Sequence, residues 1–489
     1  MHFFPAGIIV SIFVFFTLFI CILISMENRD PQKTLSWILV ITLLPGVGFV
    51  LYLMFGKNVR KRRWEKVKKK IGHYLSNEEI KKVINASSLE ELKKSLNFEK
   101  ENFDPADYRI MKLVLNSGIA PVTFDNEVMI FTEGESKFAQ MLKDLENAKH
   151  YIHLEYFIIR QSEIADKIRD VLIKKAQAGV KVRILYDDLG SWKLYLNPKY
   201  LEEMRQAGCE VVSFVQEKFP AIFFSLNYRD HRKICVIDGE IGYVGGINIG
   251  DEYVHKSRKF GFWRDTHLRI RGSAVYMLQV IFALGWYLRT EEMLIESKYF
   301  PPLEHKGSGI MQIAASGADT PAATIYQAYF YAIAQARESI YIETPYFIPD
   351  EAILTALKSA AMAGVDVRII FPEKSDHYFV HIASLSYLEE LLKFGAKVHF
   401  YEKGFIHSKM VLVDKEIVSV GTANMDIRSF MLNSEINAFI YDDETVQRLY
   451  QVFYEDIQEC RPIRLEDIAR KTFIGRLWQS ICRLFSPVM

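Results

Sequence analysis

Cysteine, excess charge and cofactor motifs are all scarce in this chain of 489 residues. The five cysteines are odd in number and widely separated, so they outline no disulfide framework, and we expect reduced thiols facing a cytosol. The 61 basic and 60 acidic residues leave a net charge of +1, which gives no sign of a nucleic-acid binder. Neither a glycine-rich nucleotide motif nor a set of side chains with metal-ligand spacing appears. We therefore expect no cofactor, no metal and no nucleic-acid partner.

The N-terminal end carries the two long apolar runs of the chain, at residues 3–24 and 35–55. Each is long enough to cross a bilayer as a helix, and nine lysines and arginines follow between residues 57 and 70. The positive-inside rule then predicts a transmembrane hairpin over residues 1–56 with both termini in the cytoplasm. A cleaved secretory signal is the alternative for the first run, although it lacks a basic start and a small-residue cleavage site. The basic cluster also fits a solvated helix.

The rest of the chain has the composition of a folded protein, with 50% hydrophobic and 25% charged residues. Residues 57–103 are basic and charged and predict a helical linker, and residues 466–489 predict a C-terminal amphipathic helix. That helix fits the membrane interface, with ordinary domain packing as the alternative. An apolar lip over the site is predicted at Phe214 and residues 219–226, where core packing is an equal alternative.

The body between these segments repeats itself. The stretch Tyr151-Ile-His-Leu-Glu-Tyr-Phe returns as Tyr341-Ile-Glu-Thr-Pro-Tyr-Phe, and Ala178-Gly-Val-Lys-Val-Arg-Ile returns as Ala363-Gly-Val-Asp-Val-Arg-Ile. In both copies a helical pattern ends at a glycine and leads into a β-branched run. This alternation predicts two α/β halves, residues 104–305 and 306–465, built around mixed, mainly parallel sheets.

A third repeated block carries the chemistry. The first copy has His231, Lys233 and Asp238, followed by Gly245, Gly246 and Asn248. The second has His407, Lys409 and Asp414, followed by Gly421, Thr422 and Asn424, each 176 positions later. Residues i and i+2 of a strand point to one face, so each His-x-Lys pair presents an imidazole beside an ammonium group. The Asp-Gly pair predicts a hairpin turn that returns the glycines and the asparagine to the histidine.

Two such blocks facing each other would form one shared active site for a phosphodiester. Two imidazoles serve acid-base and nucleophilic chemistry, two ammonium and two amide groups bind non-bridging oxygens, and the glycines allow close approach of the backbone. One block alone would be discounted, because a single His or Lys on a strand is usually a surface or packing residue. The complete block occurs twice in register inside a wider duplication, which favours function.

These motifs resemble those of the phospholipase D superfamily, whose signature is His-x-Lys-x4-Asp with a downstream Gly-Gly/Ser-x-Asn. Within it, the two N-terminal spans and the stretches Gly261-Phe-Trp-Arg-Asp-Thr-His and Thr422-Ala-Asn-Met-Asp-Ile-Arg resemble bacterial cardiolipin synthases. The resemblance implies an enzyme of the bacterial cytoplasmic membrane with its body in the cytoplasm. It would transfer a phosphatidyl group between two phosphatidylglycerols through a phosphohistidine, giving cardiolipin and glycerol.

The resemblance also assigns roles to the residues of the motifs. His231 is the expected nucleophile and His407 the expected acid and base. The phosphoryl oxygens would be held by Lys233, Lys409, Asn248 and Asn424. Asp238 and Asp414 complete the catalytic motifs as groups that position their neighbours, and Asp265 and Glu435 would orient the two histidines. We expect the chemical step to be independent of metal.

Two other classes of function remain open. A hydrolase of the same superfamily would release phosphatidic acid or cut nucleic acid, and the neutral charge and the membrane hairpin disfavour the nuclease. A non-catalytic membrane scaffold could lose His231 or His407, and this chain retains both.

Overall fold

The computed structural model describes residues 6–26, 31–44, 46–52, 68–70, 72–74, 76–78, 105–118, 120–214, 228–303, 307–317, 320, 322–469 and 472–486. They divide into two compact units, an N-terminal unit within residues 1–62 and a body within residues 63–216 and 228–489. Most of the predicted linker and residues 219–226 of the predicted lip lie outside the described residues. Phe214, the first residue of that lip, is buried in the core.

Within its described residues, the N-terminal unit contains the helices α1 (Ala6–Met26), α2 (Pro31–Leu43) and α3 (Val47–Leu51). Their contact is made by Ile20, Ile24, Ile41 and Tyr52. The second predicted span, residues 35–55, is two helices here, because α2 ends at Leu43 and Gly46 has a φ of +80° before α3 begins. No helix within the described residues is both long enough and apolar enough to cross a membrane.

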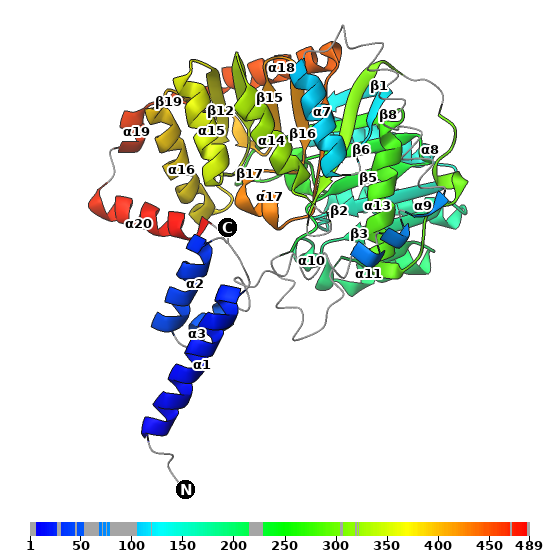
Figure 1. The fold of residues 1–489 in the computed structure, drawn as a ribbon. Coiled ribbons are helices and arrows are strands. Elements are labelled where there is room, and N and C mark those ends of the chain that lie inside the picture. The colour runs from blue at the N-terminus through cyan, green and yellow to red at the C-terminus, as the bar shows by residue number, and fades with distance from the viewer. Residues whose placement is uncertain are drawn as a thin grey trace. The chain divides into compact units, whose positions relative to one another are not determined.

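The body is an α/β fold made of two halves of similar build (Figure 1). The first half contains β1 (Val122–Phe131), α8 (Gly134–Asn147), β2 (Tyr151–Tyr156), α9 (Glu163–Gln177), β3 (Lys181–Tyr186), α10 (Trp192–Tyr195), α11 (Pro198–Gln206), β4 (Glu210–Ser213), β5 (Lys233–Ile237), β6 (Ile241–Gly245), β7 (Phe262–Arg264), β8 (His267–Arg271) and α13 (Ala274–Thr290). Helix α7 (Pro105–Ser117) precedes it.

The second half repeats this order and ends with two further helices. It contains β9 (Gly309–Ser316), α14 (Thr324–Gln335), β10 (Ser339–Glu343), β11 (Phe347–Ile348), α15 (Glu351–Met362), β12 (Asp366–Pro372), α16 (Tyr378–Lys393), β13 (Lys397–Tyr401), β14 (Gly404–Ile406), β15 (Met410–Val413), β16 (Ile417–Gly421), β17 (Met425–Asp426), α17 (Ile427–Met431), β18 (Glu435–Ile440), α18 (Asp443–Gln458) and β19 (Cys460–Ile463). Helices α19 (Leu465–Ala469) and α20 (Phe473–Leu484) follow.

The strands form a mixed sheet that is mainly antiparallel, so the prediction of mainly parallel sheets is wrong. Its order is β19-β13-β12-β10-β15-β16-β18-β9-β1-β8-β6-β5-β2-β3-β4, and the halves meet where β9 pairs with β1. Within this sheet, only β2-β3-β4 and β10-β12-β13 run parallel, because helical crossovers connect them. The other neighbouring strands of the sheet pair antiparallel, including β5 beside β2 and β15 beside β10. Two short pairs outside the sheet, β11-β17 and β7-β14, are parallel.

The predicted repeat is present, with a correction to the alignment of its first strand. Helices α9 and α15 both end at a left-handed glycine, Gly179 with φ of +92° and Gly364 with φ of +94°. The sequence pattern aligned Tyr151 with Tyr341, 190 positions apart. The register against β5 and β15 instead makes Glu155, opposite Ile234, equivalent to Glu343, opposite Met410.

The body has a hydrophobic core in each half and a third core that both halves share. One lies under α8, α9 and α11 of the first half, and a second lies under α14, α15 and α16 of the second half. The third is shared, since α13 and α18 pack between inward-facing residues of both halves. Helix α7 was predicted to begin the first half, but Ile110, Met111 and Val114 bury their side chains in the core of the second half.

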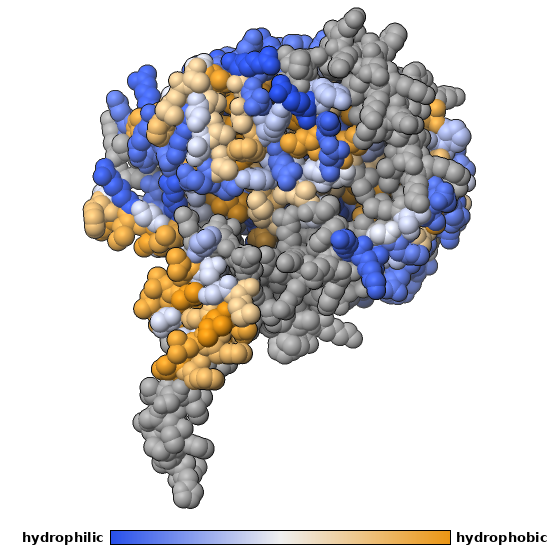
Figure 2. Space-filling view, viewed as in Figure 1, coloured by the Kyte–Doolittle hydropathy of each residue, from blue (hydrophilic) through white to orange (hydrophobic). Residues whose placement is uncertain are grey.

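Helix α20 presents an uncovered apolar face. It packs on α16 through Gln479 and Cys482, and Arg483 forms an ion pair with Glu390 at 2.8 Å. Its large apolar side chains point away from this contact and are largely exposed: Phe473 (81%), Ile474 (76%), Leu477 (52%), Leu484 (79%) and Phe485 (55%). Figure 2 shows them as a hydrophobic stripe along the helix.

Candidate active site

The two repeated blocks place each His-x-Lys pair at the start of a catalytic hairpin. His231 lies two residues before Lys233, the first residue of β5, which pairs with Tyr156 of β2. The hairpin turn predicted at Asp238 forms, because Asp238 and Gly239 adopt left-handed φ values of +53° and +70°. In the second block Asp414 has the same φ of +53°.

Each histidine is held by the opposite half of the body. The backbone N–H of His231 donates to the carbonyl of Ser434 at 2.9 Å, and that of His407 donates to the carbonyl of Arg264 at 2.7 Å. Strands β7 and β14 pair in parallel beside the second contact. The two blocks therefore meet across the boundary between the halves, as the shared site requires.

The residues that follow these backbone contacts are the carboxylates expected to orient the histidines. The Nδ1 atom of His231 lies 2.9 Å from Oε2 of Glu435, and the Nδ1 atom of His407 lies 2.8 Å from Oδ2 of Asp265. A carboxylate only accepts hydrogen bonds, so each Nδ1–H donates and each Nε2 keeps its lone pair. The pairing crosses the halves, because each carboxylate serves the histidine of the other block.

Burial keeps both imidazoles neutral. His231 is only 8% exposed, and His407 is only 7% exposed. Burial lowers the pKa of His407 to about 4, with a further decrease from the charge of Lys409. Burial also lowers the pKa of His231, against the attraction of Glu435. A bound phosphodiester would add negative charge beside these rings and raise both pKa values.

The two lysines lie beside their histidines, and the carboxylates of Asp265 and Glu435 face both of them. Lys233 Nζ donates to the carbonyl of His231 at 2.6 Å, and Lys409 Nζ donates to the carbonyl of His407. Burial lowers the pKa of Lys233 to about 7 and that of Lys409 to about 8, and the repulsion between the two ammonium groups contributes to the decrease for Lys233. An anion between them would offset this repulsion.

Asp238 and Asp414 lie away from the histidines, where they position neighbouring backbone, and a direct part in catalysis stays a prediction. Asp238 directly follows β5, and Asp414 directly follows β15. Because a strand rises by about 3.3 Å per residue, each aspartate lies at the opposite end of the strand from its histidine. Their carboxylates accept backbone N–H bonds of 2.7–2.8 Å that fix the starts of β2 and β10. The donors are Lys149, His150 and Tyr151 for Asp238, and Arg337, Glu338 and Ser339 for Asp414.

The glycines of the blocks make room for protein groups. A Cβ atom on Gly246 would lie 2.0 Å from Oδ1 of Asp265, and one on Gly421 would lie 2.3 Å from Oδ1 of Asn437. Gly245 adopts a φ of +155°, with its backbone against His267. These contacts explain the glycines through the packing of the site, where the sequence suggested close approach to a phosphoryl group.

The two asparagines are buried beside the histidine strands. Oδ1 of Asn248 accepts the backbone N–H of Ile158 at 3.1 Å, and Nδ2 of Asn424 contacts Oγ of Ser429 at 3.3 Å. Oδ1 of Asn424 has no hydrogen-bond partner in the described part of the chain, so it can accept a bond from a substrate hydroxyl group.

Two aromatic residues of the site were not predicted from the sequence. The ring of Phe157 lies 5.0 Å from that of His231, edge to face, and the ring of Trp263 lies 5.2 Å from that of His407. Both occur in stretches that the sequence analysis quoted, Phe157 in the first repeat and Trp263 two residues before Asp265. Their place within or beside repeated motifs was the signal from which the sequence could have predicted them as residues of the site.

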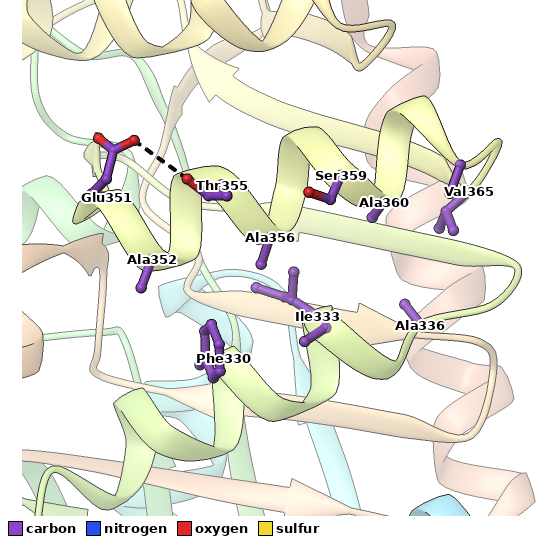
Figure 3. Close-up of a pocket in the computed structure, with 12 residues that line it drawn as sticks. Phe330, Ile333, Ala336, Glu351, Ala352, Thr355, Ala356, Ser359, Ala360 and Val365 are labelled. Carbon is purple, nitrogen blue, oxygen red and sulfur yellow. Dashed lines mark hydrogen bonds between the residues drawn. The ribbon is translucent and has the colours of Figure 1, made fainter.

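A groove in the second half lies away from the histidines. It has a volume of about 770 Å³, runs between α14 and α15, and is lined by Phe330, Ile333, Thr355 and several alanines (Figure 3). None of the lining residues belongs to the two blocks that contain His231 and His407. Across the described residues, no group of three or more His, Cys, Asp or Glu side chains is arranged to hold a metal ion.

Comparison with known proteins identifies the family. A family model described as "Cardiolipin synthase, PLD-like domain" matches residues 141–263 and 329–457. A cardiolipin synthase of Geobacillus kaustophilus is 43% identical over 474 residues, covering 96% of this chain and 92% of the relative. The chain belongs to the cardiolipin synthase family. The resemblance seen in the motifs is thereby confirmed, as is the class of the protein, a phosphatidyltransferase with a duplicated phospholipase D-like fold.

Other members of the cardiolipin synthase family match over almost the whole chain. A cardiolipin synthase of Alkalihalophilus pseudofirmus is 44% identical, covering 99% of this chain and 94% of the relative, and cardiolipin synthase 2 of Staphylococcus epidermidis is 42% identical, covering 99% and 98%. A model described as "Phospholipase_D-nuclease N-terminal" matches residues 12–57. The crystal structure of phosphatidylserine synthase from Haemophilus influenzae shares the fold, with a TM-score of 0.57, 16% identity, and 78% and 98% of the two chains covered.

Proposed function

We propose that this chain joins two phosphatidylglycerol molecules into cardiolipin and releases glycerol. The observation that carries the proposal is the crossed pair of histidines, each oriented by a carboxylate from the opposite half. Two imidazoles with free Nε2 atoms and two flanking ammonium groups match the needs of a double displacement at phosphorus.

The reaction proceeds in two balanced steps. The negative charge of the first bound lipid raises the pKa of His407, which takes up a proton at Nε2. Nε2 of His231 attacks the phosphorus of this lipid, the bond from phosphorus to the glycerol oxygen breaks, and Nε2–H of the protonated His407 gives its proton to that oxygen. Glycerol leaves and a phosphohistidine remains. Nε2 of His407 then takes the proton of a hydroxyl group on the second lipid, whose oxygen attacks phosphorus and displaces His231. Lys233, Lys409 and the two asparagine amides stabilise the non-bridging oxygens throughout.

No external energy source is needed for this exchange. One phosphodiester replaces another, so the bond energies of substrates and products nearly cancel. That no metal or cofactor takes part stays a prediction. In the proposed reaction an imidazole is the nucleophile and the lysine ammonium groups stabilise the phosphoryl oxygens, which are roles that a metal ion has in other enzymes.

The products of a single incubation test the proposal. Purified full-length protein is mixed with vesicles of labelled phosphatidylglycerol, and the lipids and the water-soluble products are separated. We expect one glycerol for each cardiolipin, and we expect a chelator to leave the rate unchanged within about twofold. Phosphatidic acid as the main product would instead identify a hydrolase. If phosphatidylglycerol were not converted at all, the result would favour a non-catalytic scaffold.

The proposal extends to a membrane-inserted location. The apolar runs at residues 3–24 and 35–55 would form a hairpin in the cytoplasmic membrane, followed by the basic cluster of residues 57–70 on the cytoplasmic side. The family match over residues 12–57 supports a role for this segment that relatives share. We also propose the domain limits that the sequence predicts and a location of the body in the cytoplasm.

A tag fused at residue 1 tests this topology. With both termini in the cytoplasm, protease added outside intact cells should leave the tag uncut, and permeabilised cells should lose it. A second fusion, at the connector near residue 28, should be cut from outside. Cleavage of the first tag in intact cells would contradict the hairpin.

Helix α20 would give the body a second contact with the bilayer surface. Its uncovered apolar face and its charges, two arginines and no acidic residue, are those of a helix lying in the interface of an anionic membrane. Tyr378 and Phe379 at the start of α16 extend the face, since the rings of Phe379 and Trp478 lie 5.8 Å apart. The alternative of ordinary domain packing accounts for Gln479 and Cys482 but leaves this face uncovered.

A further inference from the structure

Arg264 lies at the boundary between the halves, directly beside the second catalytic block. It is the last residue of β7 in the first half, where it is in register with Ile406 of β14 in the second half. The carbonyl of Arg264 accepts the backbone N–H of His407 at 2.7 Å. The next residue, Asp265, accepts from the imidazole of the same histidine. The placement of Arg264 therefore bears on both the backbone and the ring of His407.

A carboxylate of the second half holds the guanidinium group of Arg264. Nε donates to Oδ1 of Asp456 at 2.8 Å, and Nη2 donates to Oδ2 of the same residue at 2.5 Å. Asp456 lies in α18, and the side chains of Arg264 and Asp456 are only 3% and 9% exposed. Two parallel bonds between a planar fork and a carboxylate fix the orientation of the guanidinium group as well as its position. The pair is thus a buried, two-bond contact between the halves.

The third nitrogen of the guanidinium group returns to the segment that carries Asp265. Nη1 of Arg264 donates to the carbonyl of Asp265, and it also donates to Oγ1 of Thr266 at 3.0 Å. Oγ1 of Thr266 in turn lies 2.8 Å from Oγ of Ser408, the residue after His407. One arginine side chain therefore connects α18 to the backbone on which the contact between Asp265 and His407 depends.

A buried glutamate beside the ion pair shows how the halves differ. Oε2 of Glu343 lies 3.8 Å from Nη2 of Arg264, which comes from the opposite half. Oε1 of its equivalent, Glu155, lies 3.7 Å from Nη1 of Arg232, which belongs to the same half. Burial and the charge of Asp456 raise the pKa of Glu343 to about 8, so Asp456 is the acid that balances Arg264 at neutral pH. Only the second copy of this glutamate thus has its arginine from across the boundary.

The backbone contact of His231 has no arginine in the corresponding place. Ser434 precedes Glu435 in the sequence as Arg264 precedes Asp265, and its carbonyl accepts the backbone N–H of His231 at 2.9 Å. A serine side chain carries no charge and forms no ion pair. The two histidines are therefore held by similar backbone bonds, but only the bond at His407 comes from a residue that a buried ion pair fixes.

We propose that Arg264 and Asp456 are positioning residues that hold His407 in line for proton transfer. This inference rests on the proposed function and adds that the acid and base of the reaction depends on an ion pair made by both halves. Proton transfer requires the ring within hydrogen-bond reach of the oxygen, and a small displacement costs much of the rate. A displaced His407 would slow the steps that need a proton and leave the attack by His231 intact.

Two substrates with different leaving groups test this role in the full-length protein. Glycerol leaves phosphatidylglycerol with a proton, whereas nitrophenolate leaves phosphatidyl-p-nitrophenol with little need of one. Arg264→Lys keeps the positive charge of the side chain but loses the fork that binds Asp456. It should lower cardiolipin formation by about 10- to 100-fold, while the nitrophenol released in the first turnover stays within about threefold. The ratio of the two rates should follow that of His407→Ala and differ from that of His231→Ala.

Two further variants show whether the loss is specific. Arg264→Gln combined with Asp456→Asn leaves no unpaired buried charge, so it can fold where a single neutralisation fails, and it should show the same selective loss. Arg269→Lys is the matched control, because Arg269 binds Asp144 through the same two nitrogens, Nε and Nη2, within the first half. It should change both rates by the same factor. Circular dichroism identifies variants that have lost their fold.

A second measurement follows His407 without any reaction. In protein labelled with a nitrogen isotope in histidine, NMR in the absence of substrate should show less of the Nδ1–H form of His407 in the Arg264 variants. An unchanged tautomer would overturn the proposal. So would an equal fall of both reactions in a folded variant, which would assign the ion pair to the fold alone, or unchanged rates. Equal loss of both reactions in His407→Ala would instead contradict the proposed roles of the histidines, and the tautomer measurement would then decide the positioning role by itself.

Discussion

Replacing either histidine by alanine should reduce cardiolipin formation by at least about 10⁴-fold, because the two imidazoles act as one unit in the proposed reaction. In that reaction His231→Ala removes the atom that bonds to phosphorus, and His407→Ala leaves the glycerol oxygen without a proton. For the same reason the double variant should be little worse than either single variant. The measurement is the initial rate of cardiolipin formation from labelled phosphatidylglycerol.

A substrate with a better leaving group distinguishes the two roles. A phosphodiester of p-nitrophenol needs little protonation of its leaving oxygen, so His407→Ala should retain release of nitrophenol while His231→Ala should not. The reverse pattern would exchange the nucleophile and the acid. His150→Ala, which removes an exposed imidazole, is the matched control. Substantial cardiolipin formation by either single variant would remove the two-histidine mechanism.

The sequence could predict the repeat and its active groups because both depend on local patterns. Helices α9 and α15 with their terminal glycines follow from periodicity and capping, and the turn at Asp238 follows from its residue types. These predictions agree with the structure. The strand predicted for each His-x-Lys pair begins later than expected, because β5 starts at Lys233 and β15 starts at Met410.

The errors arose where distant segments decide the outcome. The sequence pattern did not reveal that most strand pairs are antiparallel. It also did not reveal that Ile110 and Met111 of α7 pack on the second half. The sequence predicted that Asp238 positions its neighbours, but it could not show that the partner is the distant start of β2. The crossed pairing of Asp265 with His407 was also hidden, because it depends on how the halves face each other.

That crossed pairing gives the second large prediction. Asp265→Asn and Glu435→Gln should each lower kcat/KM by on the order of 10²- to 10⁴-fold, since an amide can stabilise the wrong tautomer of the imidazole it contacts. Each substitution also removes a negative charge that raises the pKa of its histidine. One limb of the pH profile should therefore move toward lower pH in each variant.

The direction of this movement separates an electrostatic role from a purely structural one. Asp265→Glu and Glu435→Asp keep the charge, so they should recover part of the rate and return the limb toward its original pH. Glu210→Gln, which breaks an ion pair with Arg183 elsewhere in the body, should change neither. If the amide variants lost activity with an unshifted profile, the carboxylates would only support the fold. Because each carboxylate belongs to the half opposite its histidine, a shift in both variants would show that neither half can complete its proton transfer alone.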